Sequence, residues 1–189
     1  MGALYSETLN SLNGVLGIAV RRPDISGSFN ISVTGFWRSY VAAALVLPAN
    51  IVVIGSTVFA SGDATYSFHE GIRDMLIYGI SWLVYPLLVI HILDFLDAGD
   101  RALPYLIPYN WASVPTGYFF AFASNIGLVE GVTTAFGTSM LLVAYVLAVF
   151  LYFEIARRQL TISRFAALAV VAFDFIFSIS LLSILGSVR

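Results

Sequence analysis

Near its C-terminal end the chain reads Phe165-Ala-Ala-Leu-Ala-Val-Val-Ala-Phe-Asp174-Phe-Ile-Phe-Ser178-Ile-Ser-Leu-Leu-Ser-Ile-Leu185. As a helix, this apolar run is long enough to cross the roughly 30 Å hydrocarbon core of a bilayer. Its single charged residue, Asp174, then lies close to the bilayer midplane. An unpaired carboxylate at that depth is costly, so Asp174 must be paired, protonated or hydrated.

The composition of the whole chain indicates an integral membrane protein. Hydrophobic residues make up 59% of the sequence and charged residues only 11%. A water-soluble domain does not need that much apolar surface, whereas a bundle of membrane spans does. Cysteine is absent, which excludes disulfides and thiolate metal sites. The formal net charge of −2 gives no electrostatic reason to expect nucleic acid as a partner.

Long apolar runs without alternation favour helices over barrel strands. We therefore predict an all-α fold, a polytopic membrane helix bundle that occupies residues 37–189. It has about five transmembrane helices, which the sequence places at 37–60, 75–95, 103–128, 134–152 and 165–185.

Prolines suggest interruptions in two of these spans. Pro48, two residues before Asn50, is expected to break the first span, and Pro104, Pro108 and Pro115 are expected to interrupt the third. Broken membrane helices expose backbone groups and are tolerated where protein or a cavity covers them, as at transporter binding sites.

The arginines predict the orientation. Seven of the nine precede or connect spans on the same side, namely Arg21, Arg22, Arg38, Arg101, Arg157, Arg158 and Arg164. Arg73 and Arg189 fall on the other side. The positive-inside rule then predicts a multi-pass inner-membrane protein with a cytoplasmic N-terminus and a periplasmic C-terminus.

Aromatic residues near span ends, Tyr105, Tyr109, Trp111 and Tyr152 among them, are expected to anchor the helices at the interfaces.

Residues 1–22 predict an amphipathic helix that lies on the cytoplasmic membrane surface. Apolar side chains recur on one face at helical spacing, at Tyr5, Leu9, Leu12, Leu16 and Ala19. The helix is either an inert anchor or a functional element that docks a partner or senses the membrane. Residues 23–36 are expected to form an extended linker before the first span.

For Asp174, the sequence offers several hydrogen-bond partners. Ser178 lies on the same helical face, and the polar groups available on other spans are Asn50, Asn110, Ser113, Thr116 and His91. Two interpretations stay open. Asp174 either serves a proton or cation path or a subunit contact, or it is a protonated carboxyl that holds the bundle together.

Two further polar groups stand near span ends. His91 has Asp94 three residues later, which either orients the imidazole or shares the wet end of the helix with it. Glu154 precedes Arg157 and Arg158 at helical distances, which predicts an intrahelical ion pair or part of a larger polar cluster with His91, Asp94, Asp97, Asp100 and Arg101. Contacts with lipid headgroups or the interface are expected from Arg21, Arg22, Arg38, Trp37, Arg157 and Arg158.

The layout resembles a known family. Two stretches, Gly35-Phe-Trp-Arg-Ser-Tyr40 and Tyr152-Phe-Glu-Ile-Ala-Arg-Arg158, are similar to small alphaproteobacterial membrane proteins of the general Yip-like kind. Five short-looped spans, a cytoplasmic amphipathic segment and an outward C-terminus also resemble the Yip family. The resemblance implies an architecture and residence in a bacterial inner membrane, but no reaction.

No catalytic motif occurs in the sequence, so we predict no catalytic residue, no metal site and no cofactor. The main hypothesis is a non-enzymatic scaffold or accessory subunit that packs against a larger membrane complex. The alternative is a small channel or transporter that uses Asp174 and the proline-broken helices. The expected partners are the lipid bilayer and another membrane protein or a second copy of the chain.

Overall fold

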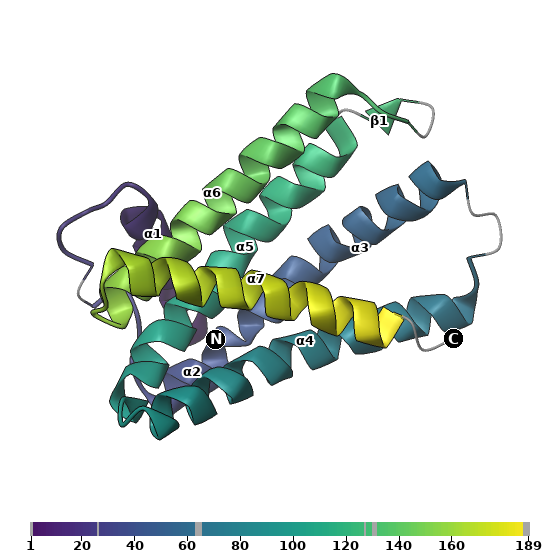
Figure 1. The fold of residues 1–189 in the computed structure, drawn as a ribbon. Helices are drawn as coiled ribbons and strands as arrows, with labels where there is room; N and C mark the ends of the chain where they lie inside the picture. The colour runs from purple at the N-terminus through teal and green to yellow at the C-terminus, as the bar shows by residue number, and fades with distance from the viewer. Residues whose placement is uncertain (1, 26, 63–65, 127, 130–131, 187–189) are drawn as a thin grey trace.

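Five long helices run back and forth between two ends of the molecule (Figure 1). The structure, a computed structural model, describes residues 2–25, 27–62, 66–126, 128–129 and 132–186. The long helices are α3 (Val41–Ser61), α4 (Phe68–Phe95), α5 (Ala102–Ile126), α6 (Ala135–Gln159) and α7 (Arg164–Gly186). The prediction of an all-helical membrane bundle is confirmed.

Shorter elements complete the fold. They are α1 (Gly2–Ala19), α2 (Val33–Ser39), the 3-10 turn η1 (Gly99–Arg101) and the strands β1 (Leu128–Val129) and β2 (Val132–Thr133). The two strands pair antiparallel as a small hairpin between α5 and α6. Helix α2 begins inside the segment expected to be an extended linker, because Ser32 caps it by accepting a hydrogen bond from the Gly35 amide at 3.0 Å.

Four helical segments are long and apolar enough to cross a membrane: Val33–Ser61, Phe68–Phe95, Ala135–Gln159 and Arg164–Leu185. The exception among the long helices is α5, which lies at the centre and packs chiefly against α3 and α6, with further contacts to α1, α2 and α4. Its buried residues include Tyr105, Leu106, Ile107 and Trp111. A helix covered by protein can carry polar residues and prolines that lipid would exclude.

The prolines do not break their helices, which corrects the sequence-based expectation. Helix α3 continues through Pro48, and α5 continues through Pro108 and Pro115. Pro104 falls in the first turn of α5, where a backbone N–H has no intrahelical acceptor in any case.

Neighbouring helices supply donors beside Pro48. This residue cannot donate to the carbonyl one turn earlier, and its ring crowds the carbonyls there. The hydroxyl of Tyr78 donates to the Ala43 carbonyl at 2.6 Å, and that of Tyr118 donates to the Leu45 carbonyl at 3.1 Å. These bonds give the disturbed turn of α3 hydrogen-bond partners from α4 and α5.

The N-terminal helix packs into the bundle with a different face from the one expected to matter. Ser11, Val15 and Ile18 are fully buried, and α1 contacts α5 and α6. The predicted apolar stripe is mainly exposed: Tyr5, Leu9 and Leu16 point away from the bundle's core. The helix therefore has two apolar faces, one that docks on the bundle and one that is free.

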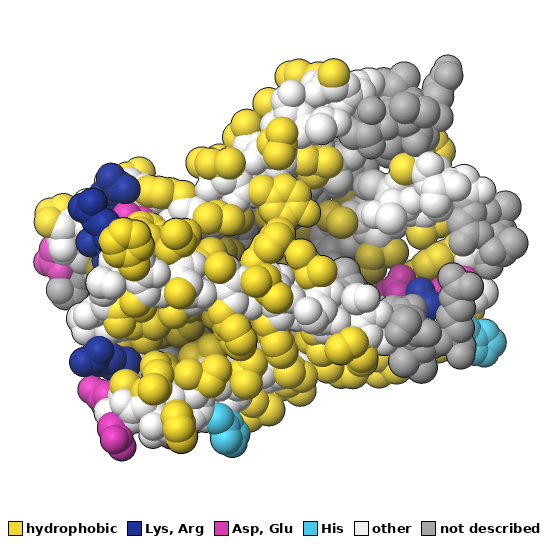
Figure 2. Space-filling model, in the orientation of Figure 1, with side chains coloured by type: hydrophobic (Ala, Val, Ile, Leu, Met, Phe, Trp, Pro, Cys, Tyr) yellow, Lys and Arg dark blue, Asp and Glu magenta, His cyan; other side chains and the backbone are white. Residues whose placement is uncertain are grey.

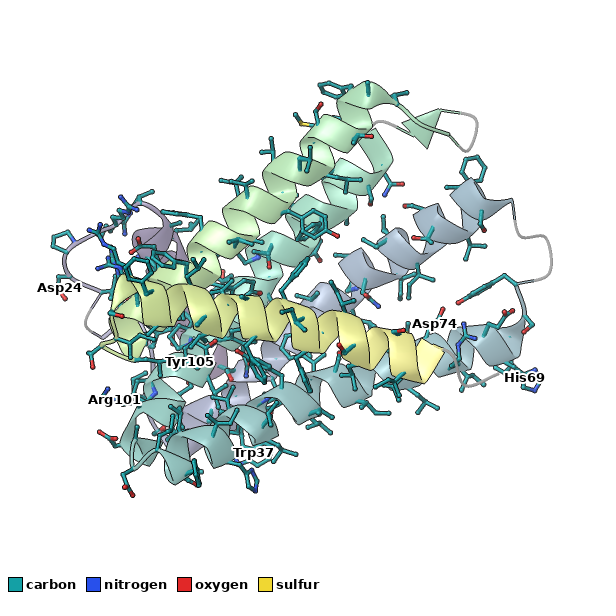
Figure 3. The ribbon with its side chains drawn as sticks, in the orientation of Figure 1. Asp24, Trp37, His69, Asp74, Arg101 and Tyr105 are labelled. Carbon is teal, nitrogen blue, oxygen red and sulfur yellow. The ribbon has the colours of Figure 1, made fainter. Side chains whose placement is uncertain are left out.

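Charged side chains separate toward the two ends of the bundle. One end, which we call the arginine end, carries Arg21, Arg22, Arg38, Arg101, Arg157 and Arg158, joined there by contacts among α1, α2, α5 and α6. Figure 2 shows most of its dark blue side chains together at the left. The opposite end, which we call the open end, carries Asp74, as Figure 3 shows. Tyr66, Glu70 and Arg73 line the same pocket as Asp74.

Candidate functional site

Asp174 is the only charged side chain buried in the middle of a long helix in the part of the chain that the structure describes, and it is 8% exposed. The hydroxyl of Tyr109 lies 3.1 Å from Oδ1 and 3.0 Å from Oδ2, and the Ser178 hydroxyl lies 3.5 Å from Oδ1. Tyr109 belongs to α5 and Asp174 to α7. The carboxyl group therefore joins the central helix to the last one.

Four tyrosines surround this bond and form a tyrosine cluster: Tyr85 from α4, Tyr105 and Tyr109 from α5, and Tyr152 from α6. The ring of Tyr109 is stacked on that of Tyr85 with 4.7 Å between centroids and lies 4.8 Å from that of Tyr152. The hydroxyls of Tyr85 and Tyr105 lie 2.7 Å apart. Each ring thus fills apolar space while its hydroxyl meets another polar group.

The other hydroxyl of the cluster also has partners. Tyr152 lies 3.3 Å from the Ser113 hydroxyl and 3.4 Å from that of Thr116. Ser113 and Thr116 were candidates to contact Asp174, but the structure places them against Tyr152, one ring further away. The expectation that Tyr105, Tyr109, Trp111 and Tyr152 anchor the interfaces is corrected, because they pack in the interior.

The remaining candidate partners of Asp174 lie elsewhere. The Asn110 side chain donates to the Ser39 hydroxyl at 2.8 Å, and both are buried between α5 and α2. His91 is exposed, and its Nδ1 lies 2.7 Å from the Leu87 carbonyl oxygen. Asp94 is also exposed on the same helix, so neither residue is buried with Asp174.

A crevice opens beside the cluster because α3 and α4 diverge from the arginine end toward the open end (Figure 1). Its volume is about 650 Å³, and its walls come from α3, α4 and α7. Asn50 lines it, together with Ser81, Tyr85 and Ser178. A smaller cavity of about 190 Å³ shares Ser81, Tyr85 and Ser178 and extends to Tyr109. The two cavities thus reach both residues that bond Asp174.

The mouth of the crevice is polar. Tyr66 donates its hydroxyl to Asp74 at 2.9 Å, and Arg73 pairs with Asp74 at 3.2 Å. Partial burial, then the hydrogen bond and the negative charge of Asp74, raise the pKa of the Tyr66 hydroxyl, so this group stays a neutral donor. Glu70 completes a capping box with Ser67 at the start of α4.

A second buried carboxylate, Glu154, organises the arginine end and is 1% exposed. Its oxygens lie 2.8 Å from Arg157, 3.2 Å from Arg158 and 3.1 Å from Arg21. The intrahelical pairs were predicted from the spacing in α6. The contact from Arg21 was not, because Arg21 is distant in the sequence and was expected to face lipid.

The broader polar cluster around Glu154 does not form as one unit. Arg101 instead donates to the carbonyl of Leu160, at 2.8 Å, and so ties the start of α5 to the end of α6. Arg38 was also expected at the lipid interface, but it pairs with Glu7 of α1 at 2.8 Å. Trp37 is largely exposed on α2, as a side chain that meets lipid would be.

Comparisons of the chain with protein-family models, with curated proteins and with solved structures gave no match. The resemblance to Yip-like proteins therefore stays a prediction. Within the described residues, no three histidine, aspartate or glutamate side chains gather where they could hold a metal ion. Most of the buried polar side chains that the structure describes instead form hydrogen bonds or ion pairs with other side chains of the protein.

Proposed function

We propose that the chain is a non-enzymatic scaffold or accessory subunit of a larger membrane complex. The observation that carries this proposal is the mutual pairing of the interior polar groups. Asp174 is held by Tyr109, Glu154 by three arginines, and Asn110 by Ser39. Polar groups used in this way hold helices together.

The surface is consistent with a subunit that meets other membrane components. Helix α7 is the most exposed of the four apolar spans, because only 12% of its apolar 18-residue stretch is buried. Phe165, Leu168, Ile176 and Ile179 all point outward along it. Such a face packs against lipid or against another transmembrane helix. The positive-inside rule supports an inner-membrane orientation with the arginine end in the cytoplasm.

Site-specific photo-crosslinking tests the proposal in native membranes. A photoreactive residue replaces Ile176, which is exposed on α7, and in the matched control it replaces Ala167, which is buried on the same helix. We expect a defined partner protein crosslinked at position 176, and none at position 167. A chain that crosslinks only lipid at 176, and that leaves the membrane as a monodisperse monomer in mild detergent, contradicts the proposal.

The crevice favours a second candidate function, that of a small channel or transporter. Its volume lies within the roughly 300–1,000 Å³ of small-molecule sites. It reaches from the polar mouth to Ser178, which bonds Asp174. The unbroken helices at Pro48 and Pro115 remove one argument for this function, whereas the crevice adds another.

Flux measurements in liposomes distinguish the second candidate from the first. If the crevice conducts, Asp174→Asn changes proton or ion flux, because it removes the only carboxyl that the crevice approaches at midspan among the described residues. Asp94→Asn, at the exposed end of α4, is the matched control. Absence of flux in the unaltered chain, or equal flux in Asp174→Asn, rejects this function.

A further inference from the structure

A second hollow lies at the arginine end, where the segment after α1 meets the end of α6. Its lining residues are Arg22, Pro23, Ile25, Arg158 and Gln159, and its volume is about 400 Å³. We call it the cationic hollow. It is separate from the crevice, and the pairing of Asp174 does not involve it.

The local charge is positive even after the ion pairs are formed. Glu154 is the one carboxylate that Arg21, Arg157 and Arg158 share. Arg22 adds a further charge, and its side chain donates to a neutral acceptor, Asn13, at 3.1 Å. Asp24 stands in the same loop and offsets one charge, so four arginines face two carboxylates.

The hollow's arginines are held in place by the fold. Arg158 donates from Nε to Glu154 at 3.2 Å and from Nη1 to the carbonyl oxygen of Arg22 at 2.9 Å. The second bond joins the end of α6 to the turn that follows α1. A guanidinium fixed in this way loses little conformational freedom when it binds an oxyanion through its remaining N–H groups.

Exposed apolar side chains lie on the helix that leads into the hollow. Leu9 and Leu16 are exposed on α1, and so is Val20, which directly follows this helix. Arg21 follows directly and lies over the ring of Phe150, 5.1 Å from its centroid. An apolar stripe that ends at a cluster of cations matches a molecule with an acyl chain and an anionic head, and it does not match a free anion.

We propose that the cationic hollow binds the phosphate headgroup of an anionic phospholipid, with an acyl chain along the exposed stripe of α1. Arg22 and Arg158 contact the phosphate oxygens, and the stripe gives α1 its place in the same leaflet. The proposal selects among the arginines that the sequence predicts to contact lipid. Arg38 already pairs with Glu7, whereas Arg22 has further N–H groups that can bind a ligand.

Thermal unfolding of the purified full chain in neutral detergent tests the site. Phosphatidylglycerol, phosphatidylcholine and inorganic phosphate are added in turn. We expect phosphatidylglycerol to raise Tm, phosphatidylcholine to raise it by less than half as much, and phosphate to leave it unchanged. An equal shift with phosphatidylcholine overturns the proposal. A full shift with phosphate alone also overturns it, since the ligand is then a soluble anion.

Variants test whether the Tm shift with phosphatidylglycerol arises at the cationic hollow. Arg22→Gln leaves all three ion pairs of Glu154 intact, and we expect it to lose at least half of the phosphatidylglycerol shift. Arg22→Lys keeps the charge and retains more of the shift, although it loses the planar fork. Arg73→Gln at the open end is the control and retains all of it. If Arg22→Gln lowers the basal Tm so far that shifts are unmeasurable, native mass spectrometry of lipid bound to Arg22→Lys and Arg73→Gln decides between the same outcomes.

Discussion

The arginine end and the open end of the bundle differ in how their helices are held. At the arginine end, Glu154, Glu7 and Arg101 tie α1, α2, α5 and α6 together by ion pairs and hydrogen bonds. At the open end, α3 and α4 diverge, and the polar contacts of Tyr66, Arg73 and Asp74 stay within one stretch of chain. The polar contacts that join different helices are therefore concentrated at the arginine end, and we call them the clamp.

We expect the largest loss of stability when the clamp at the arginine end is broken. Glu154→Gln removes the one buried carboxylate shared by three arginines, and we expect it to lower the free energy of unfolding by about 3 kcal/mol. The matched change at the open end, Glu70→Gln, weakens only a capping box and costs about 0.5 kcal/mol. Unfolding in mixed micelles measures both. Equal losses in the two variants mean that the arginine end is not the clamp.

The contact between α3 and α5 predicts the next effect. A Cβ added at Gly117 meets Val46 Cγ1 at 2.8 Å, so the two helices approach closely because this residue has no side chain. We expect Gly117→Ala to destabilise the chain by about 2 kcal/mol through overpacking. Gly79→Ala on α4 meets nothing within 4 Å and is expected to be neutral or stabilising. A neutral Gly117→Ala, measured in the same micelles, indicates that α3 is free to move away from α5.

A smaller effect is expected at midspan, between the two ends. Tyr109→Phe removes the donor that bonds both oxygens of Asp174, which leaves only the longer contact from Ser178. We expect a loss of about 1 kcal/mol in the free energy of unfolding. Tyr145→Phe, on the exposed face of α6, is the control. A double-mutant cycle with Asp174→Asn reports the coupling, and a coupling of zero contradicts the proposed link between α5 and α7.

Distance measurements test the difference between the two ends directly. The chain has no cysteine, so pairs of introduced cysteines can carry spin labels at chosen sites. Labels at Thr57 and Ile72 report the separation of α3 and α4 near the open end, and labels at Asn13 and Gln159 report the arginine end. We expect a broader distance distribution for the first pair. Equally narrow distributions indicate that the open end is as rigid as the clamp.

Much of the fold was predictable because span length and apolarity are local properties. The expected spans at 75–95 and 165–185 fall within α4 and α7. The segment at 103–128 largely forms a helix, α5, but α5 is not among the four that are long and apolar enough to cross a membrane. The effect of the prolines was not predictable. Helix α3 continues through Pro48, and Tyr78 and Tyr118 bond the Ala43 and Leu45 carbonyls from other helices, contacts that the sequence does not reveal.

The candidate site was predictable only in part. Asp174 and Ser178 were found from their spacing in one helix, and the contact is present. Tyr109 was missed because its place near the apolar span resembled that of an interfacial anchor. The spacing of Tyr105 and Tyr109, four residues apart on a helix that also carries Asn110, was the available signal for a polar interior face.

By itself, the sequence determined an all-helical membrane protein and the approximate spans, because hydrophobic length can be counted along the chain. It also showed that Asp174 is the one charged residue within the last apolar run. Only the tertiary structure decided that α5 is central, that α1 docks through Ser11, Val15 and Ile18, and that Glu154 meets Arg21. The physical reason is that a membrane helix is apolar around most of its circumference. Its sequence therefore marks the span clearly, but only packing against other helices selects the buried face.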